Sequence, residues 1–215
     1  MATLKLAWAG GSYAQNVFHL VVGKNPQSVN QGVLVHVSEP QLQEATTSTP
    51  WIAFISCDSN STDASNDTDI FAEARERGAA AVLLYSLLSE HCLLLPEYTS
   101  SDSHPIDIFA APQTSSSIII EAEYQTANVT QLRDFNASVL NDVGPTISHT
   151  LSSNGSVDVP PHMILATIST DISGSSPSQG GSETASSSSG AFRPHIQSNI
   201  YLGAGLAAGI FAILS

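Results

Sequence analysis

The chain is poor in basic residues, in cysteine and in aromatic residues. Its 215 residues include only six Lys and Arg against 19 Asp and Glu, which gives a formal net charge of −13. Nucleic-acid binding needs a basic surface that displaces counterions from the phosphates, and no cluster of Lys or Arg occurs anywhere in the sequence. The composition therefore argues against a nucleic-acid partner.

Patterns that carry enzyme chemistry are missing as well. The sequence has no HExxH, GxSxG, P-loop or GxGxxG motif, and its seven histidines are scattered with no i, i+4 pair. We therefore predict no catalytic residue, no metal ligand and no cofactor. Asp58 is the only acid that follows a buried-strand pattern, where open α/β sheets often bind ligands. An Asx turn that opens the next loop is the simpler interpretation of Asp58.

The most informative stretch of the chain predicts a βαβ unit. Residues 51–56 and 81–85 are almost continuously apolar, which is typical of parallel strands that are buried on both faces. Between them lies a polar loop and then a short amphipathic helix, which Thr68 or Asp69 can cap and which Gly78 can end. We expect the two strands to be parallel neighbours in one sheet.

The remaining pattern predicts a single α/β domain over roughly residues 15–168, with a mixed sheet or open barrel and flanking helices. Further strands are expected at 17–22, 32–37, 106–110 and 163–168. A helix is expected over 115–124, with Ile118, Ile119 and Ala122 turned inward. Residues 128–141 fit a helical face only in part, and the segment 87–104 is expected to be a surface excursion.

The two cysteines, Cys57 and Cys92, each lie just past the expected end of a strand. The carboxyl ends of neighbouring parallel strands lie close together, so a Cys57–Cys92 disulfide is geometrically reasonable in an oxidising compartment. The alternative is two separate buried thiols. We predict the disulfide.

Five Asn-x-Ser/Thr sequons point to the secretory pathway and to N-linked glycans. They begin at Asn60, Asn66, Asn128, Asn136 and Asn154. Two of the five fall in the loop between Cys57 and the helix, where a glycan would not disturb a core.

The βαβ stretch resembles the core of the protease-associated (PA) domain, a non-catalytic module of secretory and membrane proteins. The residues that carry the resemblance are Ala74, Gly78, Ala79, Ala81 and the run 82–86, which ends in Tyr85-Ser86, followed by 104–109 (HPIDIF). The resemblance covers roughly residues 30–125. It implies a domain that binds protein or peptide partners through variable surface loops, in the secretory or endosomal lumen or outside the cell.

The order of segments is similar to the luminal half of fungal-type PA–transmembrane–RING proteins. A RING needs about eight Cys and His zinc ligands, and this chain has two Cys. Two hypotheses follow: a membrane-tethered binding module, or the substrate-recruiting half of a truncated RING-type ubiquitin ligase. A decoy paralogue that has lost its RING is a third, weaker option.

The composition of the chain changes at about residue 169. We divide the chain into a luminal or extracellular domain at 1–168, a disordered Ser/Thr/Gly-rich stalk at 169–195 and a hydrophobic, helical membrane anchor at 196–215. The anchor is either a transmembrane helix or a glycolipid (GPI) signal with attachment at Ser188, Ser189 or Gly190. No clear signal peptide opens the sequence, and we expect the natural start to lie upstream.

Overall fold

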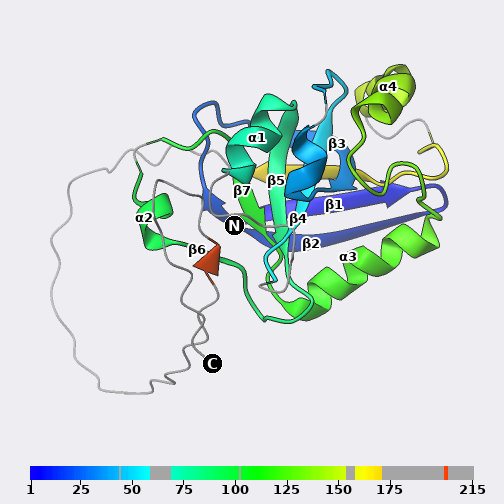
Figure 1. The fold of residues 1–215 in the computed structure, drawn as a ribbon. Coiled ribbons are helices and arrows are strands. Elements are labelled where there is room, and N and C mark those ends of the chain that lie inside the picture. The colour runs from blue at the N-terminus through cyan, green and yellow to red at the C-terminus, as the bar shows by residue number, and fades with distance from the viewer. Residues whose placement is uncertain (44, 59–68, 102, 154–157, 171–200, 203–215) are drawn as a thin grey trace, which may run out of the picture.

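A computed structural model shows that the domain is built on a closed, seven-stranded β-barrel (Figure 1). The structure describes residues 1–43, 45–58, 69–101, 103–153, 158–170 and 201–202. Around the barrel the strands follow the order β1-β2-β7-β5-β4-β3-β8. The strands are β1 (Ala2–Trp8), β2 (Gly11–Val21), β3 (Val29–His36), β4 (Trp51–Ser56), β5 (Ala79–Tyr85), β7 (Ile108–Ala110) and β8 (Leu165–Thr170).

The predicted βαβ unit is confirmed. β4 and β5 are parallel neighbours, with Phe54 opposite Leu83 in the register. β3 and β7 continue the parallel pairing on either side of them. The first five residues of β4 are buried, because barrel side chains cover one face of the strand and flanking elements cover the other.

Helix α1 (Ile70–Glu76) begins and ends as its sequence predicts. Asp69 is the N-cap, and its side chain accepts hydrogen bonds from the backbone N–H groups of Phe71 and Ala72. Phe71 and Ala74 are buried against the barrel. Gly78 follows the helix with a φ of 98°, a left-handed conformation that favours glycine.

The N-terminal strand β1 shows that the domain begins earlier than residue 15 and that the barrel is closed, not open. β1 pairs antiparallel with β2 on one side and with β8 on the other, and so joins the two ends of the sheet. Ala2, Leu4, Leu6 and Trp8 alternate with more exposed residues and point into the core. This period-two alternation is the signal of a half-buried strand, and the strands expected from the sequence begin only at residue 17.

Two longer helices follow β7. Helix α3 (Thr114–Thr126) lies over the expected range, but the prediction of its buried face is wrong. Ile118 and Ile119 are 53% and 39% exposed, and Ala122 is exposed. The buried residues are Ser116, Ser117, Ile120 and Tyr124. Polar contacts of Ser117 and Tyr124 decide which face is turned inward.

Helix α4 (Ala137–Ser152) begins nine residues later than the segment expected from 128 and extends well past 141. Asn136 caps it through a side-chain hydrogen bond from the N–H of Val139, 3.0 Å long. Pro145 lies inside the helix, a position in which proline cannot donate a backbone hydrogen bond. In Figure 1, α3 is drawn below the barrel strands, whereas α1 and α4 are drawn above them.

The excursion after β5 contains two short elements, β6 (Leu93–Leu94) and α2 (Pro96–Thr99). β6 pairs in parallel with β9 (Tyr201–Leu202). Apart from β9, the expected anchor at 196–215 lies outside the described residues, as do nearly all of the expected stalk and Ser188, Ser189 and Gly190. Within the part of the chain that the structure describes, no helix is long and apolar enough to cross a membrane.

Candidate binding surface at the carboxyl ends of the parallel strands

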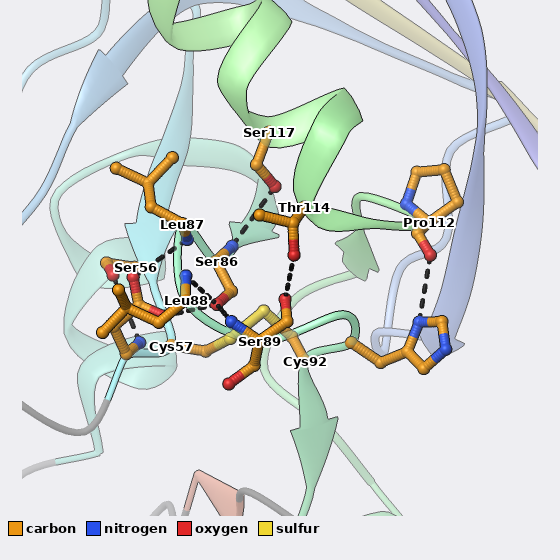
Figure 2. The surroundings of a disulfide bond; sticks show 12 residues. Ser56, Cys57, Ser86, Leu87, Leu88, Ser89, Cys92, Pro112, Thr114 and Ser117 are labelled. Atoms are coloured by element: carbon orange, nitrogen blue, oxygen red, sulfur yellow. Dashed lines mark hydrogen bonds between the residues drawn. A yellow bond between two sulfur atoms is a disulfide. The ribbon is translucent and has the colours of Figure 1, made fainter. Parts of the chain in front are cut away.

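The candidate site lies where three of the parallel strands end. β4 ends at Ser56 and leads into Cys57, and β5 ends at Tyr85 and leads into Ser86. β7 ends at Ala110 and leads into α3. The carboxyl ends of parallel strands are the edge at which α/β sheets usually present their ligand-binding loops. Figure 2 shows this edge.

The predicted disulfide joins the end of β4 to the far end of the loop that follows β5. Cys57 and Cys92 are bonded, and their Cα atoms are 5.9 Å apart. Both residues are buried, with exposed fractions of 5% and 4%. The backbone N–H of Cys57 donates to the carbonyl of Tyr85 over 2.9 Å, so the parallel pairing continues up to the disulfide. The bridge holds the far end of the loop 86–92 against the end of β4.

A network of hydrogen bonds fixes the near end of the 86–92 loop. The carboxylate of Asp58 accepts from the Ser86 hydroxyl and, over 3.0 Å, from the N–H of Leu87. The Ser86 oxygen in turn accepts from the N–H groups of Leu88 and Ser89, over 3.1 and 2.7 Å. Asp58 therefore bridges two strand ends, whereas the sequence interpretation placed it in an Asx turn of its own loop.

The first turns of α3 support the same loop from the other side (Figure 2). Ser117 accepts from the N–H of Ser86 over 3.3 Å, and Thr114 donates to the carbonyl of Ser89 over 2.7 Å. His91 Nδ1 lies 3.0 Å from the carbonyl of Pro112, which can only accept, so this ring nitrogen carries the proton. The 86–92 loop is thus held at almost every residue.

Two leucines near the start of this fixed loop face the solvent. Leu87 is 42% exposed and Leu88 is 66% exposed. Two adjacent exposed leucines form a small contiguous apolar surface, and exposed apolar area that is contiguous is the kind that marks interaction sites. Since the loop backbone is already ordered, a partner that buries these leucines would lose little conformational entropy in doing so.

A partly buried polar cluster lies beneath the site and attaches α3 to the barrel. His36, at the end of β3, lies with its Nε2 3.1 Å from Glu121 Oε1 and its Nδ1 3.2 Å from the Tyr85 hydroxyl. Arg133 Nη2 lies 3.3 Å from the other Glu121 oxygen. The His36 ring packs against the rings of Phe54, Tyr85 and Tyr124, with centroid distances of 5.0, 5.6 and 4.6 Å.

The electrostatics of this cluster suit a structural role. Burial would raise the pKa of Glu121, but the hydrogen bond and charge of His36 and the charge of Arg133 outweigh it, and the pKa is lowered. Burial and the nearby Glu121 carboxylate raise the pKa of the Tyr85 hydroxyl well above its usual range. Glu121 therefore stays ionised and Tyr85 stays protonated near neutral pH, as a fixed ion-pair network requires.

The predicted site residues fall into three groups. Cys57 and Cys92 are brought together at the candidate surface. Asn128 is exposed after the end of α3, and Asn136 is half-buried at the start of α4. Asn60, Asn66 and Asn154 lie outside the described residues. Among the residues that the structure describes, no group of three or more His, Cys, Asp or Glu could hold a metal ion.

Sequence reasoning missed the residues that shape the candidate surface. Leu87 and Leu88 fall in the expected surface excursion, Ser86 closes the run 82–86 that carries the family resemblance, and Thr114 belongs to no expected element. The available signal was the pair of leucines directly after the small polar Ser86, because large apolar residues are unusual in a loop between turn-forming residues.

Together, the fold and the site define an α/β-barrel domain with a disulfide-anchored loop at the carboxyl edge of its parallel strands. No protein-family model matches the chain, and no curated protein matches it. Among solved structures, it is similar to an aminopeptidase from Aneurinibacillus sp. strain AM-1, with a TM-score of 0.43 and 16% sequence identity. The match covers 79% of this chain and spans 30% of the length of that aminopeptidase.

Proposed function

We propose that this chain is a non-catalytic, PA-like domain that binds protein or peptide partners through the 86–92 loop, in the secretory or endosomal lumen or outside the cell. The observation that carries the proposal is the exposed Leu87–Leu88 pair on a loop fixed by a disulfide and by hydrogen bonds. A buried disulfide supports an oxidising compartment. The resemblance of residues 30–125 to the PA domain supports the class of module.

The chemistry of the loop favours a partner with an apolar segment. Leu87 and Leu88 offer apolar area, whereas the net charge of −13 disfavours acidic partners. Burying a leucine side chain fully contributes about 1.5–3 kcal/mol. Two partly exposed leucines can therefore supply about 2–3 kcal/mol of affinity, which corresponds to a factor of roughly 30–150 in Kd.

A random-peptide display library, selected against the purified full chain, tests this proposal. Peptides that are recovered should bind the wild-type chain and should bind a Leu87→Ser/Leu88→Ser variant at least tenfold more weakly in fluorescence anisotropy. Val29→Ser is the matched control, because Val29 is 46% exposed at the start of β3 and far from the loop in sequence. The proposal would be contradicted if the Leu87→Ser/Leu88→Ser variant bound the peptides as tightly as the Val29→Ser control. Recovery of no peptide would also count against it.

A further inference from the structure

The two sequons that the structure describes place their asparagines in different environments. Asn128 follows the end of α3 and is exposed, with a left-handed φ of 50°. Asn136 is half-buried and opens α4 as its N-cap. Both tripeptides, Asn128-Val129-Thr130 and Asn136-Ala137-Ser138, fit the Asn-x-Ser/Thr motif. The structure separates them.

The backbone, and not the side chain, holds Asn128 in place. Its N–H donates to the carbonyl of Gln125 over 3.0 Å, and its carbonyl accepts from His162 Nδ1 over 2.9 Å. The next residue, Val129, is buried and donates its N–H to the carbonyl of Tyr124 over 2.9 Å. No hydrogen bond joins the Asn128 side chain to any other residue that the structure describes. The amide is therefore displayed to solvent from a firmly held turn.

The side chain of Asn136 already makes a capping hydrogen bond to its helix. Its Oδ1 accepts the N–H of Val139 over 3.0 Å, which satisfies one of the donors that a helix leaves unpaired in its first turn. Holding that geometry fixes the amide plane against the half-buried surface at the start of α4. A sugar on Nδ2 would have to fit into this restricted space.

We propose that Asn128 carries an N-linked glycan and that Asn136 does not. In the reaction, the Asn128 Nδ2 forms a bond to the anomeric carbon of a lipid-linked oligosaccharide pyrophosphate. The bond from that carbon to the pyrophosphate oxygen breaks, the lipid pyrophosphate leaves, and Nδ2 loses one proton to a base of the transferase.

The glycan would lie at the opposite end of α3 from the candidate surface. The 13 residues of α3 span about 20 Å at ~1.5 Å per residue, from Thr114 beside the 86–92 loop to Thr126 near Asn128. The modified face is thus separate from the one that displays Leu87 and Leu88. This consequence rests on the proposed function, whereas the site of modification does not.

Site-specific glycan mapping tests the inference. The full chain is directed into the secretory pathway of a eukaryotic host by a cleavable signal, so that the outcome does not depend on its native compartment. Peptide N-glycosidase treatment in ¹⁸O-labelled water then converts each glycosylated Asn into labelled Asp, which peptide mass spectrometry locates. Label is expected at position 128 and not at position 136.

Two matched variants give an independent measurement. Thr130→Ala and Ser138→Ala each remove one sequon by changing an exposed residue, and neither alters the asparagine itself. Thr130→Ala should shift the electrophoretic mobility by one glycan, whereas Ser138→Ala should leave it unchanged. Absence of label at position 128, or label at position 136, overturns the inference. Neither of these results bears on the proposed function, which the peptide-binding measurement tests separately.

Discussion

At the scale of single residues, two carboxylates that are largely shielded from solvent hold elements of the domain together. The Glu121 carboxylate is shared between His36 and Arg133 and joins α3, β3 and the segment before α4. Its side chain is only 17% exposed. A second buried acid, Asp107, accepts from the N–H of Gly23 over 2.7 Å and from the Asn30 side chain. Removing such a carboxylate takes the charged acceptor away from groups that are largely shielded from solvent.

Replacing Glu121 by Gln should destabilise the domain by about 1–3 kcal/mol at pH 7, because His36 and Arg133 lose a charged acceptor. The pKa of Glu121 is lowered in the folded chain. The stabilisation by Glu121 is therefore fully present above about pH 4.3, the pKa of a glutamate in the unfolded chain. It is lost as the pH falls through the lower pKa that Glu121 has in the folded chain. Urea unfolding at several pH values between neutral and acid measures this.

The comparison is made as a difference between wild type and Glu121→Gln, because the pKa of Asp107 is also lowered: hydrogen bonds from His19, Gly23, Asn30 and Gln27 outweigh its burial. The gap between the two curves should shrink as the pH falls below about 4. Glu76→Gln, at an exposed position of α1, is the control and should follow wild type. A gap that stays constant with pH would contradict an electrostatic role for Glu121.

At the scale of elements, the sequence was sufficient where local signals and burial agree. The β4–α1–β5 unit has two continuously apolar strands, an Asp cap and a Gly stop, and all of these lie where the sequence predicts. The face of α3 could not be predicted in the same way. Its apolar residues Ile118 and Ile119 are exposed, because Ser117 and Tyr124 make inward hydrogen bonds with distant partners, Ser86 and Leu34.

The end of α1 gives a prediction that separates two costs of replacing glycine. At Gly78 the φ is 98°, and a Cβ atom would collide with the carbonyl oxygen of Thr47. At Gly10 the φ is 87°, but nothing lies within 4 Å of an added Cβ. Gly10→Ala should therefore cost only the backbone strain, about 1 kcal/mol, whereas Gly78→Ala should cost at least 2 kcal/mol more. Thermal unfolding of both variants provides the measurement. Equal losses of stability would show that an added Cβ at position 78 does not collide with the Thr47 carbonyl.

At the scale of the whole molecule, closure of the barrel was not predictable from local patterns. It depends on antiparallel pairing of β1 with β8, whose residues are more than 150 positions apart in the sequence. The candidate surface also depends on contacts between residues that are far apart in the sequence. The disulfide, Asp58, the 86–92 loop and the start of α3 come from three separate stretches of chain. Only the cysteines could be assigned in advance, because there were two of them and both followed strands.

Removing the disulfide by a Cys57→Ser/Cys92→Ser double substitution should destabilise the domain by about 3–4 kcal/mol, because the cross-link closes a long loop in the unfolded chain. The sequence separation of the two cysteines is 35 residues. Binding of the peptides selected on the wild-type chain should weaken as well, since the 86–92 loop loses the covalent attachment at its far end and keeps only its hydrogen bonds. A variant that keeps wild-type stability and affinity would show that the hydrogen bonds of Asp58 and Ser86 fix the loop alone.

The membrane tether remains a prediction from sequence, and one substitution tests both forms of it. A transmembrane helix and a GPI signal both need the uncharged run at 200–215. An Arg at the centre of a spanning helix costs about 2.5–3.5 kcal/mol, and a charge in a GPI signal interrupts its hydrophobic tail. Ala208→Arg should therefore abolish retention of the chain in the membrane fraction, whereas Ser178→Arg in the Ser-rich segment should not.

Treatment of intact cells then separates the two forms of tether for the wild-type chain. Release by phosphatidylinositol-specific phospholipase C identifies a GPI anchor, because the enzyme cuts the glycolipid and leaves the protein whole. Resistance to the phospholipase and to alkaline carbonate identifies a spanning helix, which only detergent removes from the bilayer. Release of the wild-type chain by carbonate alone would mean that residues 200–215 neither span the bilayer nor direct lipid attachment, and the proposed tether would be wrong.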